Sequence, residues 1–274
     1  MPNLDSGGAG VRLHGISQSA FDLIVEFEVS SEALYNKLYR RPTRPGGASG
    51  ITVGIGYDCG YSTAAQIRSD WGEVLSASMV AALASVSGLT GTRAASALAS
   101  VRNKVDVPWA AALAVLSNTS LPKYVALAAK LPNWDKLPPD CKGALVSLVY
   151  NRGASFGNSG SRYQEMRNIR SHMAAERFSA IPAELRSIKR IWAGDANLRG
   201  LLVRRDKEAD LFQRGLKAPL EAAAPAEAAP PEPVPDVPPR PPDPAPHPQP
   251  APQPQPSVWT AFFMAIAKLF KRSV

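Results

Sequence analysis

The stretch FDLIVEFEVSSEALY, residues 21–35, predicts an amphipathic helix that carries a carboxyl group on its apolar face. At about 100° per residue, Glu28 falls within roughly 20° of Phe21, inside the apolar stripe, whereas Glu26 falls on the side expected to face solvent. A carboxyl group on a buried face has a raised pKa and can hold a proton near neutral pH, as a general acid must. Glu28 is therefore a candidate catalytic residue.

The stretch SGITVGIGYDCGY, residues 49–61, predicts a strand in which apolar residues alternate with Thr52, two glycines and Asp58. Thr52 and Asp58 would lie about 20 Å apart in a fully extended strand, so we expect a turn at the glycines that brings both to one substrate. A buried acid, a hydroxyl and a second carboxylate around a glycine floor indicate hydrolysis of a glycosidic bond or a phosphodiester.

Two later regions have simpler patterns. Residues 62–130 are rich in Ala and Leu and predict short packed helices that serve as scaffold, with a break near Pro122. The stretch LPPDCKGALVSLVYNRG, residues 137–153, is nearly all apolar after its prolines. It predicts a buried central helix that ends before Gly153.

The helix-borne glutamate followed by SGITVGIGYD resembles the start of the phage-type lysozymes, glycoside hydrolase family 24. The ending YNRG at 150–153 resembles the close of the central helix in that family. The run GLLVRRDKEADLF at 200–212 resembles the start of its last helix. The resemblance covers about residues 16–215. It implies a mainly α fold of the α+β lysozyme-like type, with a small β-hairpin lobe and a helical lobe around a buried central helix.

The resemblance also implies an activity, hydrolysis of the β-1,4 bond between N-acetylmuramic acid and N-acetylglucosamine in peptidoglycan. Glu28 would protonate the leaving oxygen, Asp58 would stay ionised, and Thr52 would help to hold a water. This order resembles the muramidase domain of the bacteriocin pesticin. In the T-even phage arrangement the aspartate precedes the threonine by six residues, a position that Gly46 occupies here.

Three further residues are candidate substrate contacts. Arg44 lies in the loop RRPTRPGGASG, residues 40–50, where it could grip a carboxylate or phosphate or could simply be solvated. Tyr57 adjoins Asp58 in the proposed site. Asn151 could orient a catalytic carboxylate or could cap the end of the central helix.

Composition divides the chain into four parts. Of its 26 prolines, 17 lie between Pro219 and Pro256, so residues 216–256 predict a disordered Pro/Ala-rich linker. Residues 1–14 predict a flexible tail, and residues 15–215 predict one folded domain. The first 218 residues carry 27 basic and 18 acidic side chains, which suits peptidoglycan, nucleic acid or an anionic membrane. Charge does not choose among these polymers, whereas the resemblance favours peptidoglycan and no nucleic acid.

Two cysteines, Cys59 and Cys141, and three scattered histidines give neither a disulfide framework nor the spacing of a metal site. We expect no metal, no cofactor and a monomer. We expect Cys59 to fill space beneath the strand, with a disulfide to Cys141 as the alternative.

The last part, SVWTAFFMAIAKLFKRSV at residues 257–274, predicts a basic amphipathic helix that is too short to span a bilayer. We expect it to contact an anionic membrane, the alternative being packing on the domain or on a partner. The first 15 residues show no signal-peptide pattern. We therefore expect a phage or prophage endolysin that is made in the cytoplasm and acts in the periplasm and cell wall of the host.

Two other functions remain open from the sequence. A lytic transglycosylase needs a single acid and would leave an anhydro sugar end. A non-catalytic protein could instead disturb membranes or bind the wall through residues 257–274. A bacteriocin role is also open, although no receptor-binding segment is recognised before Phe21.

Overall fold

The computed structural model describes residues 11–195 and 198–217. These residues are mostly helical, with one two-stranded antiparallel sheet, which confirms the mainly α class expected from the sequence. The α-helices and strands are α1 (Gln18–Val29), α2 (Glu32–Leu38), β1 (Thr52–Val53), β2 (Tyr57–Asp58), α3 (Ala64–Trp71), α4 (Ala77–Ala84), α5 (Gly91–Arg102), α6 (Trp109–Val115), α7 (Leu121–Ala128), α8 (Pro139–Arg152), α9 (Gln164–Ala174), α10 (Ile181–Ser187) and α11 (Arg199–Lys217).

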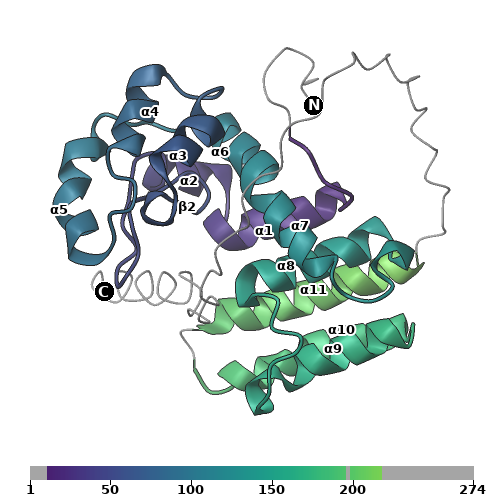
Figure 1. Ribbon diagram of the computed structural model, residues 1–274. Coiled ribbons are helices and arrows are strands. Elements are labelled where there is room, and N and C mark those ends of the chain that lie inside the picture. Colours follow the sequence, from purple (N-terminus) through teal and green to yellow (C-terminus); the bar gives the residue numbers. More distant parts are fainter. Residues whose placement is uncertain (1–10, 196–197, 218–274) are drawn as a thin grey trace, which may run out of the picture.

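The elements gather into two groups (Figure 1). The hairpin and helices α2 to α5 form the smaller group. Helices α1 and α8 to α11 form the larger one, in which α11 packs mainly on α8 and α10. Helices α6 and α7 run from one group to the other.

The expected helix at 257–274 and all of the expected linker after residue 217 lie outside the described residues. No described helix is both long and apolar enough to cross a membrane.

Helix α1 begins at a serine cap and carries the first candidate residue. The Ser17 hydroxyl accepts a hydrogen bond from the N–H of Ala20 at 3.1 Å, which satisfies one of the free donors of the first turn. Glu28 is buried in this helix and Glu26 is exposed, so the predicted helical faces are confirmed. The helix lies very close to α8, because a Cβ on Gly143 would come within 2.0 Å of the Ala20 Cβ.

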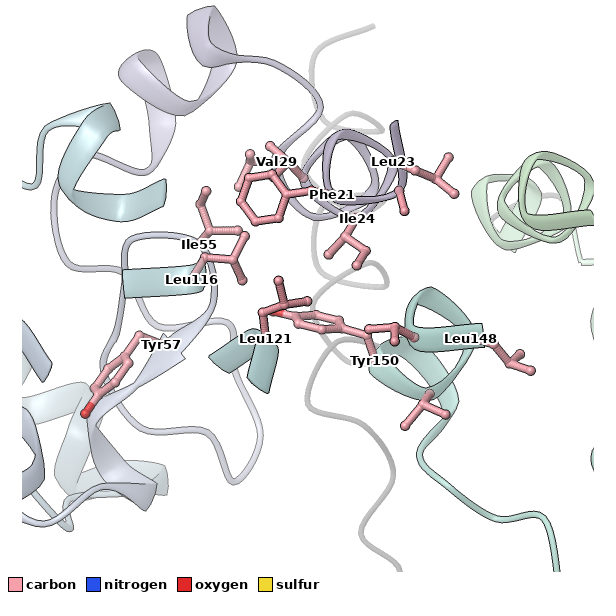
Figure 2. Packing of buried hydrophobic residues seen from close by; sticks show 14 of the residues in the cluster. Phe21, Leu23, Ile24, Val29, Ile55, Tyr57, Leu116, Leu121, Leu148 and Tyr150 are labelled. Atoms are coloured by element: carbon pink, nitrogen blue, oxygen red, sulfur yellow. The ribbon is translucent and has the colours of Figure 1, made fainter. Parts of the chain in front are cut away.

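Helix α8 is the buried centre that the sequence predicts. It begins at Pro139, where a missing N–H costs nothing, and Gly153 follows its end with a φ of 74°. Every residue from 143 to 151 is buried. Tyr150 points from α8 toward Leu121, at the start of α7 (Figure 2). Helix α8 therefore connects the larger group of helices to α7.

The predicted break near Pro122 is a change of helix type rather than an interruption. Helix α6 continues directly into a π-helical segment, Leu116–Ser120, and then into α7. Proline has no N–H to donate to the preceding turn, and a wider turn there avoids a distorted α-helical bond. Arg12 and His14, assigned above to the N-terminal tail, both bond Ser117 in this segment.

Both cysteines are buried and neither forms a disulfide within the described part of the chain. Cys59 is fully buried beneath the hairpin, as expected of an apolar filler. Burial raises the pKa of its thiol to about 12, with the charge of Asp58 adding to the effect. The sulfhydryl is therefore held in its unreactive form at neutral pH.

Candidate functional site

The hairpin brings Thr52 and Asp58 into direct opposition. Strands β1 and β2 pair antiparallel, with Thr52 opposite Asp58 and Val53 opposite Tyr57. The chain reverses through Gly54 and Gly56, whose φ angles of 59° and 82° lie in the left-handed region that glycine adopts without strain. The predicted turn at the glycines is thus confirmed.

A cavity of about 420 Å³ lies between the hairpin and helix α7. We call this cavity the hairpin pocket. The hairpin and its flanking loops supply one wall, and the end of the π-helical segment with α7 supplies the other. Its described lining residues are Pro45, Thr52, Gly56, Tyr57, Asp58, Tyr61, Ser62, Ser120, Lys123, Tyr124 and Leu127.

Thr52 offers an unused hydroxyl to this pocket. The residue is 7% exposed, and its Oγ1 has no hydrogen-bond partner among the described residues. Such a buried polar atom is costly unless a water or a ligand satisfies it. The hydroxyl is therefore suited to hold a water or a substrate oxygen in the pocket.

Asp58 is held by the backbone on both sides of its carboxylate. Its Oδ2 accepts from the N–H of Gly50 at 3.0 Å, and its Oδ1 accepts from the N–H of Gly60 at 2.8 Å. Burial raises the pKa of the Asp58 carboxyl, and the two N–H bonds act in the opposite direction. Each oxygen keeps a further lone pair, so the carboxylate can still accept a bond from a water in the pocket.

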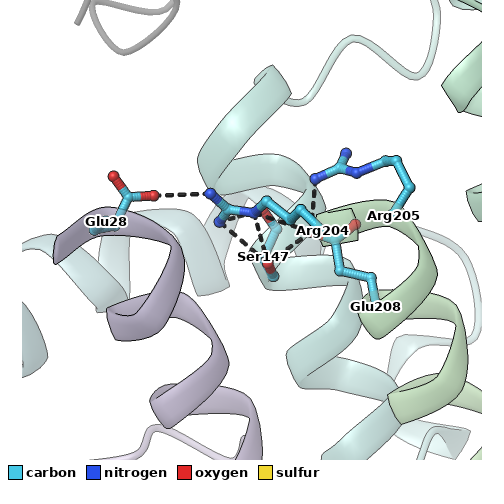
Figure 3. Close-up of polar contacts among 5 residues, drawn as sticks. All are labelled: Glu28, Ser147, Arg204, Arg205 and Glu208. Carbon is cyan, nitrogen blue, oxygen red and sulfur yellow. Dashed lines mark hydrogen bonds and ion pairs between the residues drawn. The ribbon is translucent and has the colours of Figure 1, made fainter. Parts of the chain in front are cut away.

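Glu28 is almost completely enclosed, with 1% of its side chain exposed. Its Oε1 accepts a hydrogen bond from Nη1 of Arg204 at 2.9 Å. Its Oε2 has no partner among the residues that the structure describes, and Figure 3 shows that oxygen turned away from Arg204. Burial raises the pKa of the Glu28 carboxyl, although the charge and hydrogen bond of Arg204 oppose the shift. The predicted buried acid is therefore present.

A buried polar network on α8 and α11 positions Arg204 (Figure 3). Arg204 Nη2 donates to the carbonyl of Ser147 at 3.2 Å. Glu208 Oε1 accepts from the Ser147 hydroxyl at 2.6 Å and from Arg205 Nη2 at 2.7 Å. Burial lowers the pKa of Arg205 to about 10, against the opposing charge of Glu208. The arginine pair thus forms local ion pairs with Glu208 and also anchors Glu28 through Arg204.

The structure does not bring Glu28 into the lining of the hairpin pocket. Burial raises the pKa of two phenols, Tyr124 and Tyr150, and the negative charge of an ionised Glu28 adds to both shifts. Their ring centroids are 4.3 Å apart with planes tilted by 41°. Tyr124 lines the pocket, whereas Tyr150 is buried in α8. One ring of this pair thus belongs to the pocket lining, and the charge of Glu28 affects both rings.

The three predicted substrate contacts have different surroundings. Arg44 Nη2 donates to the carbonyl of Gly47 at 2.6 Å within its own loop, and the residue is not part of the described pocket lining. Tyr57 lines the pocket, but its hydroxyl donates to Asp70 Oδ2 at 2.7 Å. Its ring turns away from the cluster around Ile55 (Figure 2). Asn151 is 8% exposed near the end of α8 and is not among the described lining residues.

One wall of the pocket was missed by sequence reasoning, because residues 62–130 were expected to act as scaffold. Ser120, Lys123, Tyr124 and Leu127 come from this region and face the hairpin across the pocket. Their positions depend on the π-helical segment, which sets the rotation of α7 about its axis. A tyrosine and a lysine side by side in an otherwise Ala- and Leu-rich run were the available signal.

In the described ranges, no three His, Cys, Asp or Glu side chains are grouped closely enough to hold a metal ion. The site therefore consists of carboxyl, hydroxyl and aromatic groups around the hairpin, with guanidinium groups behind Glu28. Comparison with models of known protein families and with curated proteins gave no match for this chain.

Proposed function

We propose that this chain is a lysozyme-like muramidase that acts on peptidoglycan, with Glu28 as its general acid. The observation that carries the proposal is the state of Glu28, a carboxyl buried in α1 with a raised pKa and one oxygen free of described partners. A protonated carboxyl in such surroundings can deliver its proton to the oxygen of a departing sugar. Arg204 then stabilises the carboxylate that remains.

The hairpin supplies the groups that complete the reaction. The ionised form of Asp58 would stabilise positive charge on the sugar or orient a water, using the lone pairs that Gly50 and Gly60 leave free. Thr52 lies opposite Asp58 in the register and would hold that water through its unpartnered Oγ1. The two residues thus act as a pair on one face of the hairpin pocket.

The overall arrangement and the charge support the same proposal. A small hairpin beside helices gathered around a buried α8 agrees with the fold that the sequence resemblance implies. Lys123 brings a cation to the pocket wall, and the folded part of the chain is basic. Both features suit the carboxylates of peptidoglycan.

We further propose a phage or prophage endolysin role, with action in the periplasm and membrane contact through residues 257–274.

The first test compares two carboxyl groups of the same helix. Glu28→Gln should slow the clearing of purified peptidoglycan by a factor of about 100 or more, because the amide has no acidic proton to give. Glu26→Gln is the matched control. Glu26 is 46% exposed and pairs with Lys207 at the surface, so its substitution should leave clearing nearly unchanged. Near-normal clearing by Glu28→Gln, with a normal melting temperature, would end the assignment.

One observation favours a second candidate, a lytic transglycosylase. Both oxygens of Asp58 are already bonded to backbone N–H groups, as a purely structural carboxylate would be, and a transglycosylase needs a single acid. Mass spectrometry of the released fragments distinguishes the two reactions, because hydrolysis leaves a reducing end and transglycosylation leaves an anhydro end.

Deletion of residues 257–274 tests the non-catalytic alternative, since the muramidase should still clear exposed peptidoglycan without them.

A further inference from the structure

The free protein keeps its proposed acid apart from its pocket. A general acid has to come within hydrogen-bond distance of the oxygen that it protonates. Glu28 is 1% exposed and does not belong to the described lining of the hairpin pocket, although its neighbours reach that lining. The carboxyl and a sugar in the pocket can therefore meet only after a rearrangement of the structure between them.

Arg204 and two phenols belong to the polar surroundings of Glu28 in the described part of the chain. Arg204 bonds its Oε1. Burial raises the pKa of Tyr124 and of Tyr150, and the negative charge of an ionised Glu28 adds to both shifts. Arg204 lies in the buried network on α11, and Tyr150 is buried in the central helix. Tyr124 differs from both, because it lines the pocket and is half-buried. It is the one member of this set that belongs to the pocket and to the surroundings of the acid.

The position of Tyr124 also allows it to move. Its ring rests on the ring of Tyr150, with centroids 4.3 Å apart, and its other surroundings include the open pocket. The open pocket leaves room on one side of the ring for a change of rotamer. Tyr124 lies four residues after the end of the π-helical segment. It belongs to the face of α7 that lines the hairpin pocket, together with Lys123 and Leu127.

We propose that Tyr124 is an aromatic gate over Glu28, closed against Tyr150 in the free protein and displaced when a sugar enters the hairpin pocket. This inference rests on the proposed function for its substrate, but the gate itself is a property of the free protein. The closed ring keeps water from the carboxyl and so contributes to the burial that raises its pKa. The displaced ring offers an apolar face against which a sugar can pack.

The gate predicts how Glu28 responds when the ring is removed. Tyr124→Ala should admit water to the carboxyl and lower its pKa toward that of an ordinary glutamate, because burial is the main cause of the raised value. Tyr124→Phe keeps the ring and should keep the acid enclosed. Tyr124→Leu keeps part of the apolar bulk and should give an intermediate result.

The experiment labels carboxyl groups of the full-length protein with a water-soluble carbodiimide and glycine ethyl ester. Mass spectrometry then reads the labelling rate at Glu28, with exposed Glu26 as a reference on the same helix. Glu208, which is fully buried and outside the pocket lining, reports any general opening of the fold. We expect Tyr124→Ala to raise Glu28 labelling about tenfold or more, with no change at the other two residues. We expect Tyr124→Phe to label as the wild type does.

A ¹³C NMR titration of the Glu28 carboxyl gives an independent measurement. Its midpoint should fall by about 1 pH unit in Tyr124→Ala and stay unchanged in Tyr124→Phe. Unchanged labelling and an unchanged midpoint in both Tyr124→Ala and Tyr124→Leu would overturn the gate. If Tyr124→Ala also exposes Glu208, Tyr124→Leu decides the question. Neither measurement needs enzymatic activity, so failure of the gate and failure of the muramidase proposal, tested by Glu28→Gln, are distinguishable.

Discussion

Nη1 of Arg204 lies 2.9 Å from Oε1 of Glu28, and the two residues are 176 positions apart in the sequence. The contact joins α11 to α1. Both side chains are 1% exposed. An unpaired charge at a buried position strongly destabilises the folded state, so the Arg204 guanidinium depends on the partners that surround it. The same contact sets the acidity of Glu28, because Arg204 opposes the effect of burial on its pKa.

Arg204→Met should therefore change both acidity and stability. Loss of the arginine removes the two effects that lower the Glu28 pKa and leaves the effect of burial. Activity requires the protonated acid, so the alkaline limb of the pH–rate profile should move to higher pH, by about 1 pH unit. The unfolding free energy at pH 7 should fall by about 1–3 kcal/mol, because Ser147 and Glu208 lose a buried hydrogen-bond donor. Arg214→Met is the control on α11. The Arg214 side chain is 59% exposed and pairs with Asp140 of α8, so its replacement should change neither property much.

The pH dependence of stability follows from the same residue. The pKa of Glu28 is raised in the folded state, so the folded state binds more protons than the unfolded state once the pH exceeds the ordinary glutamate range. The contribution of Glu28 is fully present at low pH and is lost as the pH rises through the folded-state pKa. Denaturant unfolding at several pH values should therefore show a smaller decline with pH in Glu28→Gln than in the wild type. An identical decline in both proteins would contradict the raised pKa.

Thr52→Val should separate activity from stability. The hydroxyl has no partner among the described residues, so its replacement by a methyl group of similar shape removes a desolvation cost. We expect the unfolding free energy to be unchanged or higher by up to about 1 kcal/mol, while kcat falls about tenfold or more because the water is no longer held. Thr52→Ser restores a hydroxyl and should recover most of the activity. A fully active Thr52→Val would remove Thr52 from the mechanism.

Gly50→Ala tests the backbone contacts of Asp58. A Cβ at residue 50 would lie 2.2 Å from Asp58 Oδ1 and 2.5 Å from the Cα of Gly60. The carboxylate and the loop would both have to shift, so we expect a loss of about 1–3 kcal/mol in unfolding free energy together with a loss of activity. Gly200→Ala is the matched control, since a Cβ there meets nothing within 4 Å and alanine favours the helix. Normal activity in Gly50→Ala would show that the position of Asp58 is unimportant.

Glu208→Gln tests the network behind the site. Glu208 is fully buried, and its Oε1 accepts bonds from Ser147, Arg204 and Arg205. The amide keeps the shape but loses the charge that balances two buried guanidinium groups, so the unfolding free energy should fall by about 3–5 kcal/mol. Asp210→Asn is the control on α11. The Asp210 side chain is 68% exposed and pairs with Arg186 of α10, so its replacement should cost less than about 1 kcal/mol. Equal costs for the two variants in urea denaturation would contradict this account.

Local patterns in the sequence were sufficient for the parts of the site that depend on a single element. Helical periodicity placed Glu28 on the buried face of α1 and Glu26 outside it, because burial along one helix repeats every 3.6 residues. The glycines between Thr52 and Asp58 indicated the turn that the structure contains, since left-handed φ angles there favour glycine. The apolar run of α8 likewise predicted its central position.

Contacts between distant segments could not be predicted in this way. The two N–H bonds to Asp58 require the close approach of Gly50 to Gly60, which depends on how the loop from residue 40 to 50 returns to the hairpin. The pocket wall that contains Tyr124 comes from a helix that looked like scaffold. Arg44 lies in the predicted loop, but its bond to Gly47 is set by loop conformation rather than by any periodic pattern.

The π-helical segment Leu116–Ser120 fixes the phase between α6 and α7. One extra residue in a helical turn advances everything after it by about 100°. A chain shortened by one residue in this segment would keep both helices and their lengths, yet Lys123, Tyr124 and Leu127 would rotate off the pocket wall. The α7 wall of the hairpin pocket thus depends on the number of residues between α6 and α7, and insertions or deletions there should be far less tolerated than substitutions.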